Sequence, residues 1–474
     1  MSRLRRSGST IARTLEEAGI IEESHLRPTV DLAWPRIVTG LAIMSKQTVD
    51  MALVGLVIGP TAVAGLTLAR AFWMVAKFAA IGLAGGTVAL VSQNYGGGDN
   101  DRAAAVVRLS VLLSVALGIP IVALFGLGAE SLVGLVGDDP ESIGHGAVYL
   151  AVVAPGLFFE FLNLIASRTY AGVGDTVTPM AVRAGGGIAN IALSATFVLG
   201  LDMGVAGAAL GTALATFLVT VIFAWGMTGR TYVRGRGASP VPITFEGPLV
   251  DVSLLRQIAR VSTPLVARRA AQGLVVFPLL AIAATFGPVA VAAIGIGRQV
   301  RALLASFSWG FSIAASTLVG QELGAGEETE AEAYGWGIVR LSAVVYVFAA
   351  ALVVVFADPI AGVFVTEAEN RALSAQFVRV AAVSVVAMGI DGSITGALRG
   401  AGDTRIPFVS ALAGLYLVAV PVAWLGTVVP VLGITGLLLA LLAETAVPMV
   451  VNFWRFRSNR WKAISREYRP TVGD

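Results

Sequence analysis

The chain has 474 residues, of which 56% are hydrophobic and 13% are charged, and its mean hydropathy is +0.81. A soluble domain carries about a quarter of its residues as charges, so this composition excludes an ordinary soluble protein and indicates lipid as the solvent. The net charge of +3 gives no reason to expect nucleic-acid binding, and the absence of cysteine excludes disulfides, thiolate catalysis and cysteine metal sites.

Apolar windows follow one another along almost the whole chain. A helix needs roughly 20 mainly apolar residues to cross a bilayer. Twelve windows are long enough, and they lie at about 33–55, 61–92, 103–127, 144–167, 177–199, 203–227, 254–284, 289–318, 335–357, 372–397, 405–427 and 431–454. None shows a strand-like alternation, and backbone groups in hydrocarbon must be satisfied within each segment. All twelve are therefore predicted helices, and the late start of the first makes a cleavable signal peptide unexpected.

The connections between these windows differ in charge. Basic residues gather in the N-terminal tail, around the middle of the chain and in the C-terminal tail: Arg3, Arg5, Arg6, Arg13, Arg27, Arg230, Arg234, Arg236, Arg256, Arg260, Arg455, Arg457, Arg460, Lys462, Arg466 and Arg469. The connections at 128–143 and 358–370 are acidic. Because basic connections stay in the cytoplasm, we expect a multi-pass protein of the cell membrane with both termini inside.

The sequence repeats itself at a fixed displacement. GPTAVAGLTLAR at 59–70 corresponds to GPVAVAAIGIGR at 287–298, LVSQNYGGG at 90–98 to LVGQELGAG at 318–326, and GVGDTVTP at 172–179 to GAGDTRIP at 400–407. Each pair is 228 positions apart. Each half holds six windows, so the halves have the same orientation in the membrane. Parallel repeats are typical of transporters, which place the site between the halves and alternate its access, although duplicated bundles also serve as channels or scaffolds.

The repeat predicts the domain organisation. The expected fold is an all-α integral membrane protein with twelve transmembrane helices in two parallel-repeat six-helix lobes around a central cavity. We expect a cytoplasmic segment at 1–32, an N-lobe at 33–228, a cytoplasmic linker at 229–253, a C-lobe at 254–455 and a cytoplasmic tail at 456–474.

The repeated motifs also resemble a known family. WPRIVTGLAIMSKQTVDMALVG, LVSQNYGGGDNDRA and TYAGVGDTVTP, with their second-half counterparts, are similar to multidrug and toxic compound extrusion (MATE) transporters of the prokaryotic DinF or archaeal type. The resemblance covers the whole chain. It implies a secondary antiporter that exports amphipathic organic cations and drugs in exchange for H⁺ or Na⁺. We expect a monomer, with no cofactor and no enzymatic activity.

Asp50 is the leading candidate for coupling, because an ionisable side chain inside a span is costly and needs a reason. In the resemblance it occupies the position of the coupling carboxylate of the N-lobe. A carboxylate in an apolar pocket can take up a proton near neutral pH. The alternative is an ion pair with Lys46, one helical turn earlier.

Three polar residues lie at a depth similar to that of Asp50, counted at 1.5 Å per helical residue. They are Asn190, Ser194 and Thr212. Asn190 and Thr212 match polar positions of the archaeal-type site, so Na⁺ at Asp50, Asn190 and Thr212 is one possibility. At Ser194 the resemblance predicts a second aspartate, and its absence weakens a Na⁺ site while leaving a proton carrier plausible. Such residues also serve helix packing alone.

Four further residues are candidates for binding substrate or a second ion: Glu160, Asn163, Asp391 and Glu444. Asp391 lies 228 positions after Asn163. The alternative for Asp391 is an ion pair with Arg268 or Arg269, and Glu160 and Glu444 can likewise pair with nearby arginines. Trp73 is one candidate for an aromatic wall, and Pro35 matches a proline whose helix bending the resemblance links to release.

The sequence bears on two function classes other than a MATE-like antiporter. A membrane-embedded enzyme is disfavoured, because the chain has no Walker loop, nucleophile elbow or metal-ligand cluster. A lipid-linked oligosaccharide or lipid flippase of the same wider superfamily remains open, since such proteins have a basic cavity and spans two, seven and eight carry arginines.

Overall fold

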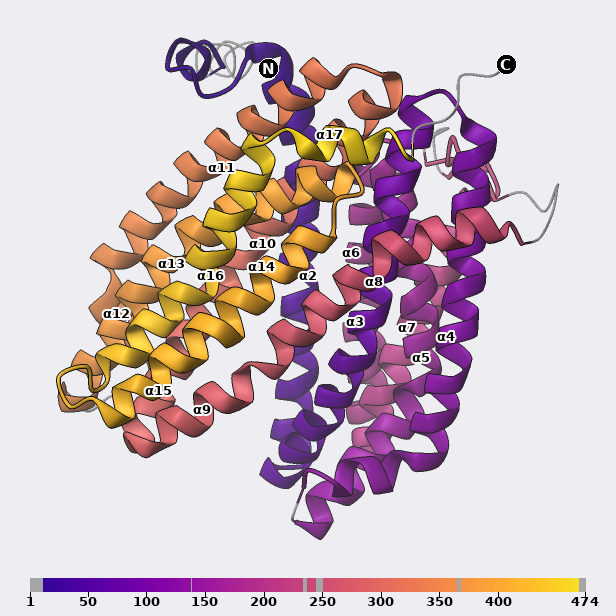
Figure 1. Ribbon diagram of the computed structural model, residues 1–474. Helices are drawn as coiled ribbons and strands as arrows, with labels where there is room; N and C mark the ends of the chain where they lie inside the picture. Colours follow the sequence, from indigo (N-terminus) through magenta and orange to yellow (C-terminus); the bar gives the residue numbers. More distant parts are fainter. Residues whose placement is uncertain (1–11, 138, 233–236, 244–249, 365–367, 469–474) are drawn as a thin grey trace. The chain divides into compact units, whose positions relative to one another are not determined.

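The computed structural model describes residues 12–137, 139–232, 237–243, 250–364 and 368–468. These residues form helices and connecting turns without a strand (Figure 1). Twelve helical segments in this part of the chain are long and apolar enough to cross a membrane. The predicted all-α fold with twelve spans is therefore confirmed. Arg3, Arg5, Arg6, Arg234, Arg236 and Arg469, and parts of the predicted linker, lie outside the described residues.

By internal packing the chain divides into two units. The N-terminal unit comprises residues 38–266, and the C-terminal unit comprises residues 1–37 with 267–474. The lobes expected from the sequence begin at 33 and 254. In the structure the boundaries between the units lie further along the chain, within the first and seventh spans. The first change lies two residues after Pro35, within a helix that continues through it.

The N-terminal unit is built from six spans. It holds most of α2 (Glu23–Val57), then α3 (Pro60–Gly96), α4 (Asn100–Gly134), α5 (Pro140–Gly172), α6 (Val177–Ala195) with the π-helix η1 (Thr196–Gly200), α7 (Gly204–Met227) and the start of α8 (Val252–Leu274). Helix α5 is central, because it packs against α3, α4 and α7. A Cβ on Gly82 or Gly86 of α3 would collide with Val266 and Ser262, so the start of α8 lies directly on α3.

The C-terminal unit repeats this arrangement. It contains the rest of α8, α9 (Val276–Thr285), α10 (Pro288–Ala325), α11 (Glu328–Val355), α12 (Ala357–Phe364), α13 (Ala368–Gly400), α14 (Arg405–Leu412), the π-helix η3 (Ala413–Ala419), α15 (Val420–Val428), α16 (Thr435–Arg457) and α17 (Arg460–Ser465). Here α13 is central and packs against α10, α11 and α16. Glycines at 392, 396 and 400 of α13 meet serines at 308, 312 and 316 of α10. Small residues at such spacing let helix backbones approach closely in a membrane.

The repeated sequence motifs form matching turns. Gly174 and Gly402 have positive φ angles of 91° and 83° and end α5 and α13. The amide of the following aspartate donates to a carbonyl of the helix just ended, from Asp175 to Tyr170 at 2.9 Å and from Asp403 to Leu398 at 2.8 Å. Asp175 Oδ1 then accepts from the amide of Thr178 and caps α6. The two motifs thus end corresponding helices of the two units in the same way, as expected for a sequence repeat of 228 positions.

The terminal segments of the C-terminal unit meet at the start of α11 (Figure 1). His25 near the start of α2 lies 2.5 Å from Glu330, and Lys462 on α17 lies 2.5 Å from Glu332. Trp461 is fully buried and stacks on Phe456. Helix α17 is therefore part of the folded unit.

Candidate functional site

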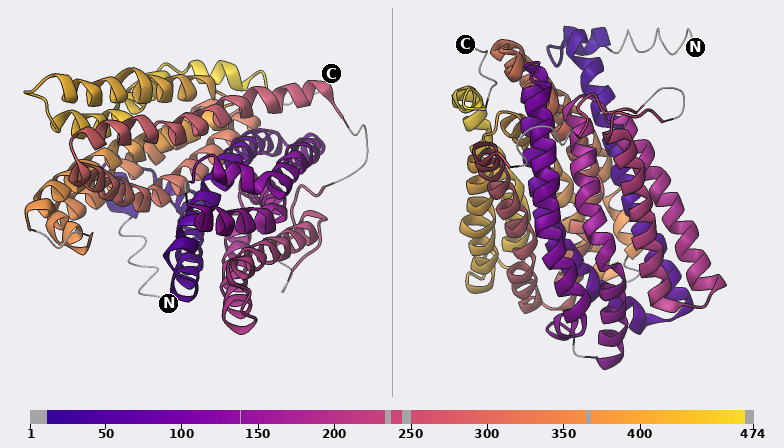
Figure 2. Two further views of the ribbon diagram at one scale, coloured as in Figure 1. Left: turned by 90° about the horizontal axis from the view of Figure 1, so that it is seen from below. Right: turned by 90° about the vertical axis from the view of Figure 1, so that its right-hand side faces the viewer.

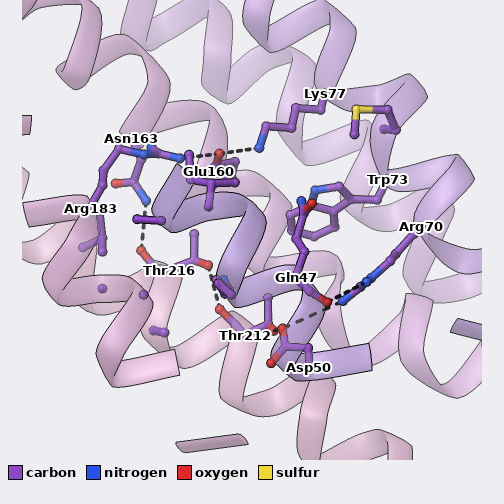
Figure 3. A pocket seen from close by; sticks show the side chains of 18 of the residues that line it. Gln47, Asp50, Arg70, Trp73, Lys77, Glu160, Asn163, Arg183, Thr212 and Thr216 are labelled. Atoms are coloured by element: carbon purple, nitrogen blue, oxygen red, sulfur yellow. Dashed lines mark hydrogen bonds and ion pairs between the residues drawn. The ribbon is translucent and has the colours of Figure 1, made fainter. Parts of the chain in front are cut away.

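The N-terminal unit encloses a cavity of about 160 Å³ between α2, α3, α5, α6 and α7 (Figure 3). Its lining residues are Ala42, Ile43, Lys46, Gln47, Asp50, Arg70, Trp73, Met74, Lys77, Tyr149, Glu160, Asn163, Arg183, Gly186, Gly187, Thr212, Ala215, Thr216 and Val219. Four sequence-predicted residues, Asp50, Thr212, Glu160 and Asn163, line this one cavity. Asn190 and Ser194 lie in the wall behind it, fully buried.

Asp50 lies at one end of the cavity and is only 2% exposed. Thr212 Oγ1 donates to Asp50 Oδ2 at 3.3 Å, and Asn190 Nδ2 lies 2.9 Å from Thr212 Oγ1. Turning the Asn190 amide gives a better network. Its nitrogen then donates to Asp50 Oδ1 at 3.1 Å, and its oxygen accepts from the amide of Thr212 at 3.2 Å. The Asn190 oxygen also lies 2.9 Å from the Thr212 hydroxyl, whose single proton it shares with Asp50 Oδ2. Helices α2, α6 and α7 thus meet at this carboxylate.

Ser194 lies beside this network without joining it fully. Its hydroxyl is buried and lacks a hydrogen-bond partner among the described residues. A Cβ on Gly211 of α7 would come within 2.6 Å of that hydroxyl. The close approach of α6 and α7 therefore brings Ser194 to the site.

The cation nearest to Asp50 is not the predicted one. Arg70 Nη2 lies 3.9 Å from Asp50 Oδ2, and Arg70 Nη1 donates to the carbonyl of Gln47 at 3.2 Å (Figure 3). The alternative of a Lys46–Asp50 ion pair is not observed, and the lysine instead turns toward the cavity. Lys46 makes no hydrogen bond or close ion pair with the described side chains. It feels attraction from Asp50 and Glu160 and repulsion from Lys77 and Arg183.

Glu160 lies at the other end of the cavity and binds two cations. Its Oε1 is 2.7 Å from Lys77 Nζ on α3 and 2.7 Å from Arg183 Nη2 on α6 (Figure 3). Of the alternatives weighed for Glu160, the ion pair is therefore present. Asn163, one turn further along α5, donates to the carbonyl of Thr216 at 3.0 Å.

Two polar atoms at this end are buried without a hydrogen-bond partner. They are Arg183 Nη1 and Asn163 Oδ1. The Arg183 side chain is 10% exposed, and it lines the cavity. Buried groups of this kind are expensive unless something binds them.

The candidates in the C-terminal unit are held by arginines. Arg268 Nη2 lies 2.6 Å from Asp391 Oδ2, and Asn452 Nδ2 donates to Asp391 Oδ1 at 2.7 Å. Glu444 accepts from both Arg298 and Arg301. The ion pairs given as alternatives for Asp391 and Glu444 are thus the observed arrangement.

The corresponding positions of the two units are used differently. Arg298 and Arg301 lie 228 positions after Arg70 and Trp73, which line the cavity of the N-terminal unit. In the repeat alignment of this segment, Glu444 corresponds to Ala215, which also lines that cavity. In the C-terminal unit, Arg298, Arg301 and Glu444 form an ion-paired triad. The corresponding residues of the N-terminal unit line its cavity.

Arg183 is the site residue that the sequence analysis missed. It lies in the fifth predicted span, so the rule that drew attention to Asp50 applies to it equally. Its pairing with Glu160 depends on how α5 and α6 are rotated, which the spacing of residues does not reveal.

Comparison with known proteins accords with this architecture. The MatE family model matches residues 35–196 and again residues 264–425, once in each half. A probable multidrug resistance protein NorM of Bradyrhizobium diazoefficiens is 28% identical over 446 residues, covering 90% of this chain and 92% of that protein. The multidrug resistance protein PmpM of Pseudomonas aeruginosa is 24% identical, covering 86% and 85%.

Solved structures show the same fold. A crystal structure of MATE in the bent conformation has a TM-score of 0.85 at 21% identity and covers 94% of this chain and 97% of its own. An outward-facing MATE family transporter of the MOP superfamily has a TM-score of 0.84 at 22% identity, with coverage of 93% and 96%.

These matches define a multi-pass membrane transporter rather than an enzyme. The chain belongs to the MatE family, that is, the MATE transporters, and it has their two-lobe, twelve-helix fold.

Proposed function

We propose that the chain is a proton-coupled antiporter that exports amphipathic organic cations and drugs from the cytoplasm. Access alternates between its two lobes, and Asp50 carries the proton. The names of its relatives, multidrug resistance proteins, support the export of drugs. The observation that carries the proposal is the buried carboxylate of Asp50, which accepts hydrogen bonds from the neutral side chains of Asn190 and Thr212 at one end of the cavity.

The surroundings of Asp50 favour H⁺ over Na⁺ as the coupling ion. Na⁺ prefers several oxygen ligands and no neighbouring cation. Asp50, Thr212, Ser194 and Asn190 offer oxygens, but Ser194 supplies no second carboxylate, and the Arg70 guanidinium lies 3.9 Å away. A proton needs only the carboxylate itself, and its uptake removes the charge that Arg70 balances.

Exchange follows if the substrate and the proton compete for Asp50. The ionised carboxylate attracts the cationic group of a substrate, and protonation removes that attraction. On the outside, proton binding to Asp50 releases the substrate. On the inside, loss of the proton lets Asp50 bind the next substrate, so the proton gradient across the cytoplasmic membrane drives export.

Transport by the full-length protein in proteoliposomes tests the proposal. We expect an imposed pH gradient to drive uptake of a fluorescent rhodamine dye, and a Na⁺ gradient of the same size to drive none. Asp50→Asn should abolish driven transport, while Arg230→Gln, an exposed site outside the cavity, should leave it intact. Transport driven by Na⁺ alone would refute proton coupling, and undiminished transport by Asp50→Asn would refute the role of Asp50.

A further inference from the structure

The cavity of the N-terminal unit contains more basic than acidic side chains. Lys46, Arg70, Lys77 and Arg183 line it together with only Asp50 and Glu160. Four positive and two negative groups leave a formal charge of +2. In a membrane an excess of like charge is costly, and such residues are retained where they serve an ion or a substrate.

Both acids are already engaged by cations. Glu160 is contacted by Lys77 and Arg183, and Asp50 lies near Arg70. The two acids therefore offset only part of the positive charge in the cavity, and an excess remains. A substrate that carries a negative group beside its cationic group would offset this excess.

Two of these side chains line the cavity and carry N–H donors without a hydrogen-bond partner among the described residues. Lys46 on α2 has no hydrogen bond or close ion pair with the described side chains, although Asp50 and Glu160 attract it from a greater distance while Lys77 and Arg183 repel it. Arg183 on α6 uses Nη2 for Glu160, but its Nη1 is buried without a partner. Charged N–H donors of this kind bind the oxygens of a carboxylate strongly.

We propose that the cavity binds the carboxylate of a zwitterionic amphipathic substrate between Lys46 and Arg183. The carboxylate accepts from Lys46 Nζ and Arg183 Nη1 and compensates the excess charge. This inference rests on the proposed exchange at Asp50, which requires that the same substrate also carry a cationic group. Trp73 also lines this cavity, and its ring provides a flat apolar surface for the aromatic part of the substrate (Figure 3).

The absence of cysteine from the chain allows a direct test of the cavity's charge. Gly187 lines the cavity one helical turn after Arg183, and a Cβ added there meets nothing within 4 Å. In full-length Gly187→Cys in nanodiscs, we would measure reaction rates with an anionic sulfonatoethyl and a cationic trimethylammonioethyl methanethiosulfonate. The ratio of rates, normalised to a free thiol, should favour the anion by about tenfold or more.

Removing the donors should reduce this preference. Lys46→Gln and Arg183→Gln, each introduced into Gly187→Cys, should lower the ratio about threefold or more, since each removes a nearby positive charge. Arg230→Gln should not change it. Ala42→Cys on α2 is a second position in the wall. A ratio at or below one, or thiols unreactive toward both reagents at both positions, would overturn the proposal.

Binding of a matched dye pair tests the carboxylate itself. A rhodamine with a free carboxylate is a zwitterion, and its methyl ester is a cation with the same ring system. Wild-type protein should bind the free acid at least about tenfold more tightly than the ester, and Lys46→Gln should remove most of that difference. Equal or tighter binding of the ester, or failure of both dyes to bind, would overturn the inference.

The two proposals fail in distinguishable ways. If the ester is transported by the pH gradient better than the free acid, the antiporter proposal stands and the carboxylate site is wrong. If the free acid binds through Lys46 and Arg183 but no pH gradient moves either dye, the site stands and the proposed coupling is wrong.

Discussion

Asp50 and Glu444 are both buried acids inside spans, yet their surroundings differ in kind. Asp50 faces a cavity, and its hydrogen-bonding neighbours are the neutral Asn190 and Thr212. Glu444 is 4% exposed at its side chain and is held by Arg298 and Arg301. A carboxylate between two guanidinium groups is already neutralised, which suits a structural role better than the uptake of a proton or a substrate.

This contrast predicts that Glu444→Gln damages stability rather than binding. It leaves Arg298 and Arg301 buried without a counter-charge, which typically costs about 3 kcal/mol or more. We expect a clearly lower thermal unfolding temperature in detergent, with substrate affinity kept in the folded fraction. Unchanged stability combined with weaker substrate binding would assign Glu444 to a binding site instead.

At the scale of helices, the backbones of α6 and α7 approach each other closely where Gly211 meets Ser194. A Cβ on Gly211 would come within 2.7 Å of the backbone nitrogen of Ser194 and 2.9 Å of its Cα. Asn190 and Thr212 occupy the same two helices, so this contact sets the hydrogen bonds around Asp50. Because the Ser194 atoms in this contact belong to the backbone, they cannot move aside as the end of a flexible side chain can.

Gly211→Ala should therefore push α6 and α7 apart. We expect a loss of about 1–3 kcal/mol in unfolding free energy, together with weaker pH-driven transport. Gly187→Ala on α6 is the matched control, because its added methyl group meets nothing within 4 Å. Equal stability of the two variants, measured by thermal unfolding, would show that the contact does not control the site.

The elements were largely predictable from the sequence, whereas the ion pairs were not. The helix ends follow from motifs such as Gly174–Asp175 and Gly402–Asp403, where a positive φ angle requires glycine. The convergence of Asp50, Asn190 and Thr212 follows from their depth in the membrane. Which cation contacts each acid depends on helix rotation and side-chain reach. That is why Arg70, rather than Lys46, lies next to Asp50, and why the contact of Arg183 with Glu160 was missed.

At the scale of the whole molecule, the two units share a framework but differ in how their intramembrane charges are used. In the C-terminal unit, Asp391 and Glu444 are engaged by arginines from neighbouring helices. In the N-terminal unit, the residues that correspond to Arg298, Arg301 and Glu444 line a cavity that also holds Asp50. Lys46 in this cavity has no close ion pair with a described side chain, and Arg183 pairs with Glu160 through Nη2 while its Nη1 lacks a hydrogen-bond partner among the described residues. The repeat thus accounts for the shared framework, and the difference in charge between the units is the basis of our proposal that the N-terminal unit carries the coupling ion.

Proton release on substrate binding tests the central claim most directly. Purified full-length protein in weakly buffered detergent solution, near the pH at which Asp50 is partly protonated, would be titrated with a rhodamine dye while pH and bound dye are recorded. Competition at Asp50 predicts that the wild type releases up to about one proton per dye bound, and that Asp50→Asn binds dye without releasing a proton. Equal release by both proteins, or binding to the wild type without release at any pH tested, would contradict the account.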